Sequence, residues 1–136
     1  MKKLNISGNN LSGVDPGLLA TALNRLEEVE MYGGTWLTVQ QVEGILTGLH
    51  AGLVKKLDIS YNNMSTVDPG LLASAVNGLK EVVMFGTELT VQQAEAILTQ
   101  SLVKTSVRSL RMGVHRVPGL DEDLVGRARL AIRNLY

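Results

Sequence analysis

The sequence predicts an α/β solenoid, in which strand-and-helix units stack into a single domain. The main observation is an internal repeat, because residues 4–31 return as residues 57–84 with 19 of 28 positions identical. Each copy holds a short run of alternating apolar residues, typical of a strand, and then apolar residues at helical spacing. A chain that repeats a strand and a helix at a fixed period is a stack of units that bury their apolar faces against one another.

The first unit begins with a short strand around Leu4 and Ile6, whose alternating apolar positions fit a sheet with one buried face. Asp15 is a good helix N-cap, and Pro16 stands at the first helical position, where its missing amide hydrogen costs nothing. The apolar stripe of the helix that follows is Leu18, Leu19, Ala22, Leu23 and Leu26.

The second unit has a strand at Val29 and Met31, which Gly33-Gly34 interrupts. Thr38, with Gln41 three residues later, forms the capping-box pattern that opens a helix. The expected apolar positions of this helix are Val42, Ile45, Leu46, Leu49 and Leu53.

The third and fourth units repeat the first and second, with helix caps at Asp68 and at the capping box formed by Thr90 and Gln93. Their expected inward-facing residues are Leu57, Ile59, Leu71, Leu72, Ala75, Val76, Leu79, Val82, Met84, Ala94, Ile97, Leu98 and Leu102.

A fifth unit is more divergent, with Leu110 and Met112 on its strand and Asp121 at its helix cap. Its helical stripe is expected to run through Leu124, Val125, Ala128 and Ile132. The strand anchors of the five units, spaced 25, 28, 25 and 28 residues apart, are Leu4, Val29, Leu57, Val82 and Leu110. The expected units of this single domain are residues 1–25, 26–53, 54–78, 79–106 and 107–136, with boundaries that are approximate.

The composition narrows the classes of function. Thirteen basic and thirteen acidic residues give a formal net charge of zero, which argues against binding to nucleic acid or to an anionic membrane. Neither a long apolar run nor a signal peptide is expected, and the absence of cysteine excludes disulfides, thiolate metal sites and cysteine nucleophiles. We therefore expect a cytoplasmic protein. In the alternative, a secreted protein, Asn5, Asn10 and Asn63 lie in sequons and would be glycosylation acceptors.

The repeated strand-and-turn segments resemble those of the leucine-rich repeat family, whose signature is L-x-x-L-x-L-x-x-N-x-L. That frame is filled twice, by Met1, Leu4, Ile6, Asn9 and Leu11 and by Val54, Leu57, Ile59, Asn62 and Met64. The alternation of two helix-bearing units is similar to the ribonuclease-inhibitor-like subclass. The resemblance implies a right-handed βα solenoid shaped as a horseshoe arc, with a parallel sheet on the concave face and helices on the convex face.

The signature asparagine is replaced in three units. Thr35 and Thr87 take its place in the second and fourth units, where a threonine hydroxyl is still able to hydrogen-bond the backbone of the turn. In the fifth unit the position is His115, for which the same role is not expected.

Side chains on either side of the strand anchors should point to the concave face, because side chains alternate along a strand. They form three rows across the sheet: Lys3, Glu28, Lys56, Glu81, Ser109; then Asn5, Glu30, Asp58, Val83, Arg111; then Ser7, Tyr32, Ser60, Phe85, Gly113. Neighbouring strands lie about 4.8 Å apart, so we expect the alternating charges of the first row to pair between units.

Features that suggest catalysis or metal binding are weak. Glu30 and Asp58 are adjacent carboxylates, but no nucleophile, base or closed cleft accompanies them. His50 and His115 have no partner at metal-ligand spacing, and Gly33-Gly34 lacks the lysine and the full glycine pattern of a phosphate loop. We therefore expect no enzyme activity, no cofactor and no metal site.

An aromatic group formed by Tyr32, Tyr61 and Phe85, with Trp36 near its rim, suits either a binding patch or the packing of the turns. The open question is whether these rings serve a partner or the scaffold.

The last helix carries a basic stripe expected at Arg127, Arg129 and Arg133, preceded by acidic residues that match a helix dipole better than a nucleic-acid site. Arg129 replaces Leu23 and Val76 of earlier units, so this end looks like the polar cap that a solenoid requires. The first unit lacks such a cap, and we hypothesise that another copy covers it, giving a homo-oligomer.

We predict a non-enzymatic module that binds a protein or peptide through its concave face. The alternative is a structural scaffold, duplicated or engineered, with no specific ligand beyond self-association. The predicted contact residues are Glu30, Tyr32, Asp58, Tyr61, Val83, Phe85 and Arg111.

Overall fold

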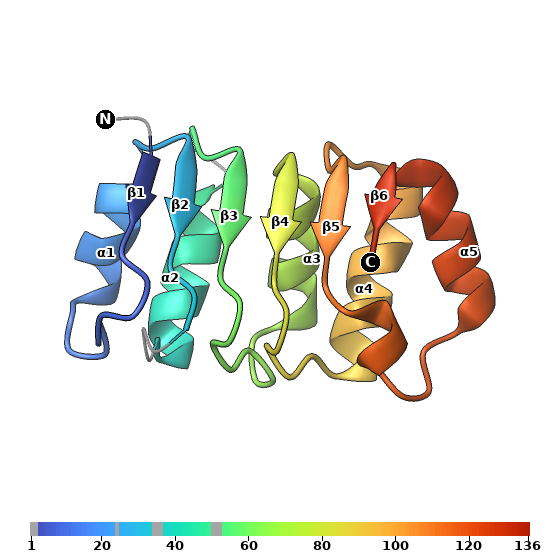
Figure 1. Ribbon diagram of the computed structural model, residues 1–136, viewed down its shortest axis with the longest axis horizontal. Helices are drawn as coiled ribbons and strands as arrows, with labels where there is room; N and C mark the ends of the chain where they lie inside the picture. Colours follow the sequence, from blue (N-terminus) through green and yellow to red (C-terminus); the bar gives the residue numbers. More distant parts are fainter. Residues whose placement is uncertain (1–2, 24, 34–36, 50–52) are drawn as a thin grey trace.

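The computed structural model describes residues 3–23, 25–33, 37–49 and 53–136. Within these residues, strands and helices alternate, and six strands form one parallel sheet in chain order (Figure 1). The strands are β1 (Lys3–Asn5), β2 (Glu28–Glu30), β3 (Lys56–Asp58), β4 (Glu81–Val83), β5 (Ser109–Arg111) and β6 (Asn134–Leu135). The helices are α1 (Pro16–Leu23), α2 (Val39–Leu49), α3 (Pro69–Asn77), α4 (Val91–Val103) and α5 (Glu122–Ala131), with a 3₁₀ helix η1 (Val114–Arg116). The predicted solenoid is confirmed.

The helices form a layer behind the sheet and leave its other face open (Figure 1). The strand anchors pair in register across the sheet, Leu4 with Val29, then Leu57, Val82 and Leu110. Packed helices need roughly 8–10 Å each, about twice the strand spacing. The open sheet face is therefore the inner side of the arc, and we call it the concave face.

The expected caps start the helices. Asp68 accepts a hydrogen bond from the Leu71 amide at 2.9 Å, and Asp15 accepts the equivalent bond from Leu18 at 3.0 Å. In α4 the Thr90 hydroxyl accepts from the Gln93 amide while the Gln93 side chain accepts from the Thr90 amide. Local sequence alone therefore fixes where these helices begin.

The core lies between sheet and helices, and most of the predicted apolar positions are buried there. Leu18, Ala22, Leu53 and Leu102 are wrong predictions, since all four are exposed, Leu18 at 65%, Leu53 at 62% and Leu102 at 37%. Leu18 and Ala22 lie on α1 of the first unit, whose outer side no other described unit covers. Leu53 lies beyond the end of α2. In α4 the helical period brings Ser101, not Leu102, onto the buried face after Ile97.

Buried glutamines join neighbouring units. The Gln93 side-chain amide donates to the carbonyls of Met64 at 2.6 Å and Val67 at 2.8 Å, both in the preceding unit. Gln41 makes the same pair of bonds, to Leu11 at 2.6 Å and Val14 at 2.7 Å. Each glutamine therefore caps its own helix and also satisfies loop carbonyls of the unit before it.

The signature polar residue holds the turn after the strand. Asn62 donates to the Ile59 carbonyl at 3.1 Å and across units to Met31 at 2.9 Å. Thr87 donates to the Met84 carbonyl at 2.9 Å, so it replaces asparagine as expected, whereas Thr35 lies outside the described residues. His115 is exposed, and its turn closes as η1 instead.

The last residues differ from the expectation. Ile132 is buried as expected, but it lies at the C-cap of α5, which ends at Ala131, and β6 follows with Leu135 paired to Leu110. Leu135 lies 25 residues after Leu110, at the next step of the 25 and 28 alternation. Arg133 is therefore not on the helix, and the basic stripe of α5 reduces to Arg127 and Arg129.

Gln93→Ala should lower the free energy of unfolding by about 2–3 kcal/mol, because it removes a helix cap and leaves two buried carbonyls without a donor. Gln92→Ala, at an exposed position of the same helix, is the matched control and should change stability by less than about 0.5 kcal/mol. Urea unfolding of the two variants measures the difference. Equal effects would contradict the joining role of Gln93.

Candidate binding face

The parallel register brings most of the predicted contact residues together on the concave face. Glu30, Asp58 and Val83 are successive partners across β2, β3 and β4, and Arg111 continues this row on β5. Tyr136, just after β6, exchanges backbone hydrogen bonds with residues on either side of Arg111. The row therefore crosses the sheet from Asn5 to Tyr136.

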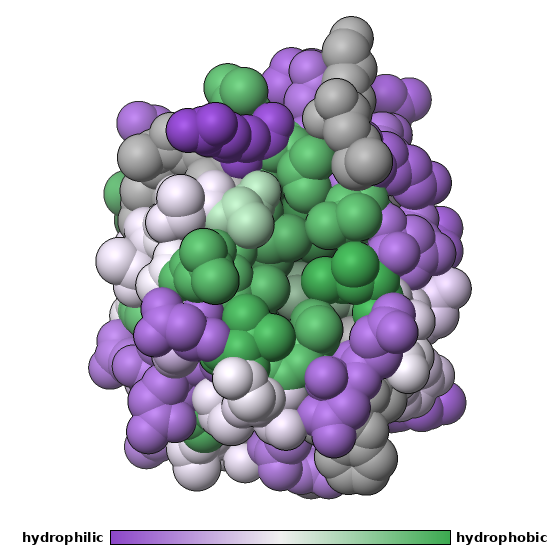
Figure 2. Space-filling model, turned by 90° about the vertical axis from the view of Figure 1, so that its left-hand side faces the viewer, coloured by the Kyte–Doolittle hydropathy of each residue, from purple (hydrophilic) through white to green (hydrophobic). Residues whose placement is uncertain are grey.

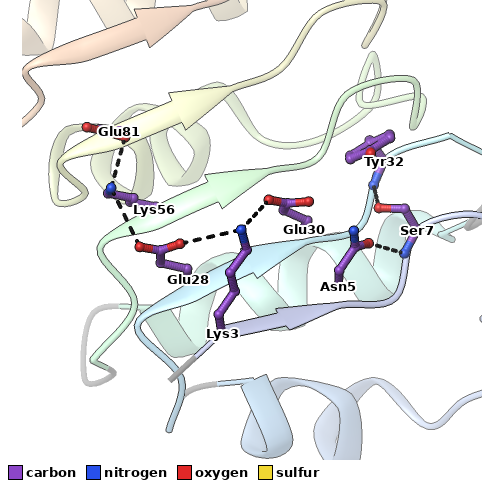
Figure 3. A network of polar contacts seen from close by, with 8 residues as sticks. All are labelled: Lys3, Asn5, Ser7, Glu28, Glu30, Tyr32, Lys56 and Glu81. Carbon is purple, nitrogen blue, oxygen red and sulfur yellow. Dashed lines mark hydrogen bonds and ion pairs between the residues drawn. The ribbon is translucent and has the colours of Figure 1, made fainter. Parts of the chain in front are cut away.

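Lysines and glutamates pair along the first row, as expected (Figure 3). Lys3 lies 3.9 Å from Glu28, and Lys56 lies 3.5 Å from Glu28 and 3.6 Å from Glu81. Exposed pairs of this kind contribute roughly 0–1 kcal/mol each. Their main effect is to neutralise this edge of the concave face and to fix the order of the strands.

Glu30 also takes part in this pairing. Its carboxylate lies 3.1 Å from the Lys3 ammonium (Figure 3). The hydrogen bond from Lys3 to Glu30 is the main reason why the pKa of Lys3 is raised, with the charges of Glu30 and Glu28 adding to the effect. A cationic partner that binds Glu30 must therefore compete with Lys3.

A shallow hollow of about 150 Å³ lies over β2, β3 and β4. Three predicted contact residues, Glu30, Asp58 and Val83, line it. The full lining is Glu28, Val29, Glu30, Lys56, Leu57, Asp58, Glu81 and Val83. The lining carries four carboxylates and one ammonium, and Lys3 lies against Glu28 and Glu30, so two negative charges remain in excess and the hollow suits a basic side chain.

Asp58 lines the hollow and also accepts a hydrogen bond that stabilises the turn after β3. One carboxylate oxygen accepts a hydrogen bond from the Ser60 amide at 3.0 Å, which shapes the turn after β3. In the first unit Asn5 accepts the same bond from Ser7 at 3.0 Å (Figure 3). The turn therefore needs the side-chain oxygen and does not need the charge of Asp58.

The serines of the third row hydrogen-bond the backbone of the neighbouring unit. The Ser60 hydroxyl accepts from the Phe85 amide at 3.0 Å, and the Ser7 hydroxyl accepts from the Tyr32 amide at 3.0 Å (Figure 3). Both hydroxyls extend the strand-to-strand hydrogen bonding beyond the strands themselves. They hold the backbone that carries Tyr32 and Phe85, which are respectively exposed and half-buried.

Tyr61 lies in the turn at the rim of the sheet, with a left-handed φ of 64°. The equivalent turns of the second and fourth units place Gly33 and Gly86 there, with φ of 60° and 63°. A tyrosine in this region is strained by roughly 1–2 kcal/mol. Its ring packs on Gly86, since a Cβ built at Gly86 would lie 2.5 Å from the Tyr61 ring, yet the side chain is 66% exposed.

The rings of Tyr61 and Phe85 each contact a glycine in a neighbouring turn. The Phe85 ring lies near Gly113, as the Tyr61 ring lies on Gly86, so both rings reach the turn of the following unit. This contact supports turn packing for Tyr61 and Phe85, while the exposure of Tyr61 keeps a binding role open. Trp36 lies outside the described residues.

Tyr136 is a face residue that the sequence did not predict, because no sixth strand was expected after the last helix. The Arg111 guanidinium lies 5.5 Å from the centre of the Tyr136 ring, a cation–π contact. The 25-residue step from Leu110 to Leu135 is the signal that could have identified Tyr136, which lies 25 residues after Arg111, as the next residue in this row. Arg111 is thus held in position at the far end of the face.

The other candidate features have structural explanations. His115 is exposed beside η1, and His50 lies outside the described residues. Asn10 and Asn63, both in sequons, accept hydrogen bonds from the serine two residues later, so the turn itself requires the Asn-x-Ser pattern. Across the described ranges, no cluster of three or more His, Asp or Glu side chains is arranged for a metal ion.

Comparison with protein families agrees with this architecture. Residues 1–22 and 53–75 match the model of the Leucine Rich Repeat family, and each stretch covers a strand, its turn and most of the next helix. A search among curated proteins gave no match. Together with the solenoid, the two matches support a leucine-rich repeat protein, whereas the ribonuclease-inhibitor-like subclass stays a prediction.

Leucine-rich repeat domains are generally protein-interaction modules and are typically non-enzymatic. In the part of the chain that the structure describes, no helix combines the length and apolar character needed to cross a bilayer. Any function must therefore be argued from the residues of the concave face and not from the fold.

Gly86→Ala should lower the free energy of unfolding by about 2–3 kcal/mol, because the new Cβ meets the Tyr61 ring and alanine disfavours a positive φ. In a Tyr61→Ala background the same change should cost about 1 kcal/mol less, which a double-mutant cycle of unfolding free energies measures. Gly126→Ala, in an open stretch of α5, is the control and should not destabilise the protein. Additive effects of the first two changes would contradict the ring contact.

Proposed function

We propose that this chain is a non-enzymatic binding module that takes a basic segment of a protein or peptide along its concave face. The observation that carries the proposal is the acidic hollow over β2, β3 and β4, with Asp58 in its lining. An extended segment crossing the strands would place a lysine or arginine in the hollow, where opposite charges attract at close range.

Exposed side chains around the hollow would provide the rest of the contact. Tyr32 and Tyr61 lie toward the turn side of the face, while Arg111 and Tyr136 lie at its C-terminal end. Tryptophan, tyrosine and arginine are enriched among the few residues that contribute most of the binding energy in interfaces. Phe85 and Val83, both half-buried, would form the apolar floor between these groups.

The open sheet argues against catalysis as the function. Glu30 and Asp58 face solvent in a hollow of only about 150 Å³, and Glu30 is already paired with Lys3. An acid–base pair needs a site that excludes water and positions a substrate. The setting that we propose is the cytoplasm, which agrees with the absence of cysteine and with the structural use of the sequon asparagines.

The second candidate is a duplicated or engineered repeat scaffold, with no specific ligand beyond self-association. The identity of 19 of 28 positions between residues 4–31 and 57–84 favours it, as does the exposed apolar surface of the first unit. The two candidates differ in what they predict for the concave face: the first predicts that it binds a peptide, and the second predicts that it binds none.

Peptides selected by the protein from a random peptide library should be enriched in lysine and arginine, and their affinity should fall with rising salt. Asp58→Asn keeps the turn hydrogen bond, as Asn5 shows, and removes only the charge. It should raise the Kd of a selected peptide by roughly tenfold, whereas the control Thr99→Ala, exposed on α4, should leave it unchanged.

Tyr32→Ala, at an exposed position of the concave face, should abolish peptide binding with little change in thermal unfolding. Calorimetry and a thermal melt on the same samples separate binding from folding. A large fall in Tm would assign the Tyr32 ring to the scaffold. A library that yields no enriched peptide, or peptides that bind Asp58→Asn as tightly as the original protein, would favour the scaffold without a ligand.

A further inference from the structure

The outer face of the first unit, on the side of β1 and α1 away from the rest of the chain, is apolar and uncovered. Figure 2 looks onto this end of the molecule and shows hydrophobic surface gathered at its centre with hydrophilic surface around it. Leu18 is 65% exposed on α1, and Ala22 is exposed beside it on the same helix. The partly buried apolar residues of this unit are Leu4, Ile6, Leu11 and Val14.

The third unit shows what this surface does when a neighbour covers it. Leu57, Met64 and Val67 are the counterparts of Leu4, Leu11 and Val14 in the repeat, and all three are buried. Ala75, the counterpart of exposed Ala22, is also buried. The difference arises because the second unit packs against the third, with β2 paired to β3. The outer face of the first unit is therefore a copy of a surface that packs closely elsewhere in the same molecule.

The backbone of β1 adds to this surface. One side of β1 is hydrogen-bonded to β2, and its other side is the edge of the sheet among the described residues. A free strand edge beside an apolar surface is a template for pairing with another chain. Lys3, the charged side chain of β1, is already paired with Glu28 and Glu30, so two β1 edges would meet without unneutralised lysines.

The opposite end of the solenoid does not offer a matching surface. On α5 the exposed side chains include Glu122, Asp123, Arg127 and Arg129, and Asp123 pairs with Arg127 at 3.3 Å. Arg129 occupies the position that Leu23 and Val76 fill in the first and third units. Stacking the first unit of one copy on α5 of another would bury these charges against apolar side chains, which is unfavourable.

We propose that a second copy of this chain docks on the outer face of the first unit across a two-fold axis. The two apolar faces then bury one another, with α1 beside α1 and β1 beside β1 of the partner. Because such a contact uses the same patch on both copies, it closes at a dimer and does not grow into a filament. The concave face takes no part in the contact, so dimerisation and peptide binding succeed or fail independently.

Sedimentation velocity over a broad range of concentrations tests this proposal. The expected result is a reversible monomer–dimer equilibrium with no larger species. Leu18→Glu places a carboxylate in the apolar contact and should raise the dimer Kd by roughly tenfold or more. The matched control is Leu130→Glu, which changes an 89% exposed leucine on α5 at the other end and should leave the dimer Kd unchanged.

Disulfide trapping provides a second test that does not depend on a destabilising variant. The natural chain has no cysteine, so Ala22→Cys introduces a single thiol at an exposed position of the docking face. Mild oxidation should give a covalent dimer, whereas Leu130→Cys should remain largely monomeric. A protein that is monomeric at every concentration would overturn the proposal. So would masses that keep rising beyond the dimer, or an equal loss of dimer in Leu18→Glu and Leu130→Glu.

Discussion

The whole structure depends on the covering of each unit by its neighbours. A single strand-and-helix unit exposes apolar side chains toward the unit before it and toward the unit after it. It has too few residues to bury both surfaces by itself. In the middle of the solenoid, Leu57, Met64 and Val82 are fully enclosed because units lie on both sides of them. In the first unit, Leu4 and Leu11 have the same sequence context and remain partly exposed. Burial in this protein is therefore decided by position in the stack as much as by residue type.

Polar side chains make this covering specific. Gln93 spans two units, since it caps α4 and donates to loop carbonyls of the unit before it, and Asn62 reaches back to the Met31 carbonyl in the same way. A buried carbonyl without a donor costs about 1–3 kcal/mol, so a shift of one unit against its neighbour would break several such bonds together. These bonds set the register that aligns Glu30, Asp58 and Val83 in one row. The candidate binding face is thus a consequence of how the units are joined behind it.

Local patterns in the sequence predicted the fold well, because caps and strand anchors act over a few residues. Asp15, Asp68 and the Thr90–Gln93 box each start a helix where expected, and the first-row charges pair as their alternation predicts. Strand β6 was missed because Ile132 fits both the end of a helical stripe and an apolar position two residues before a strand, and only the long-range spacing separates the two. The second role of Gln93 and the packing of the Tyr61 ring on Gly86 depend on contacts between residues that are 25 or more positions apart, which no local pattern contains.

Hydrogen–deuterium exchange at low and high protein concentration tests this account most directly, because amide protection reports local stability. If neighbour coverage governs stability and a second copy covers the first unit, residues 4–23 should exchange fast in dilute protein and gain protection as the concentration rises. Residues 57–98, which are covered on both sides within one chain, should be strongly protected at both concentrations. Equal protection of the two segments in dilute protein, or protection of residues 4–23 that does not change with concentration, would contradict the account.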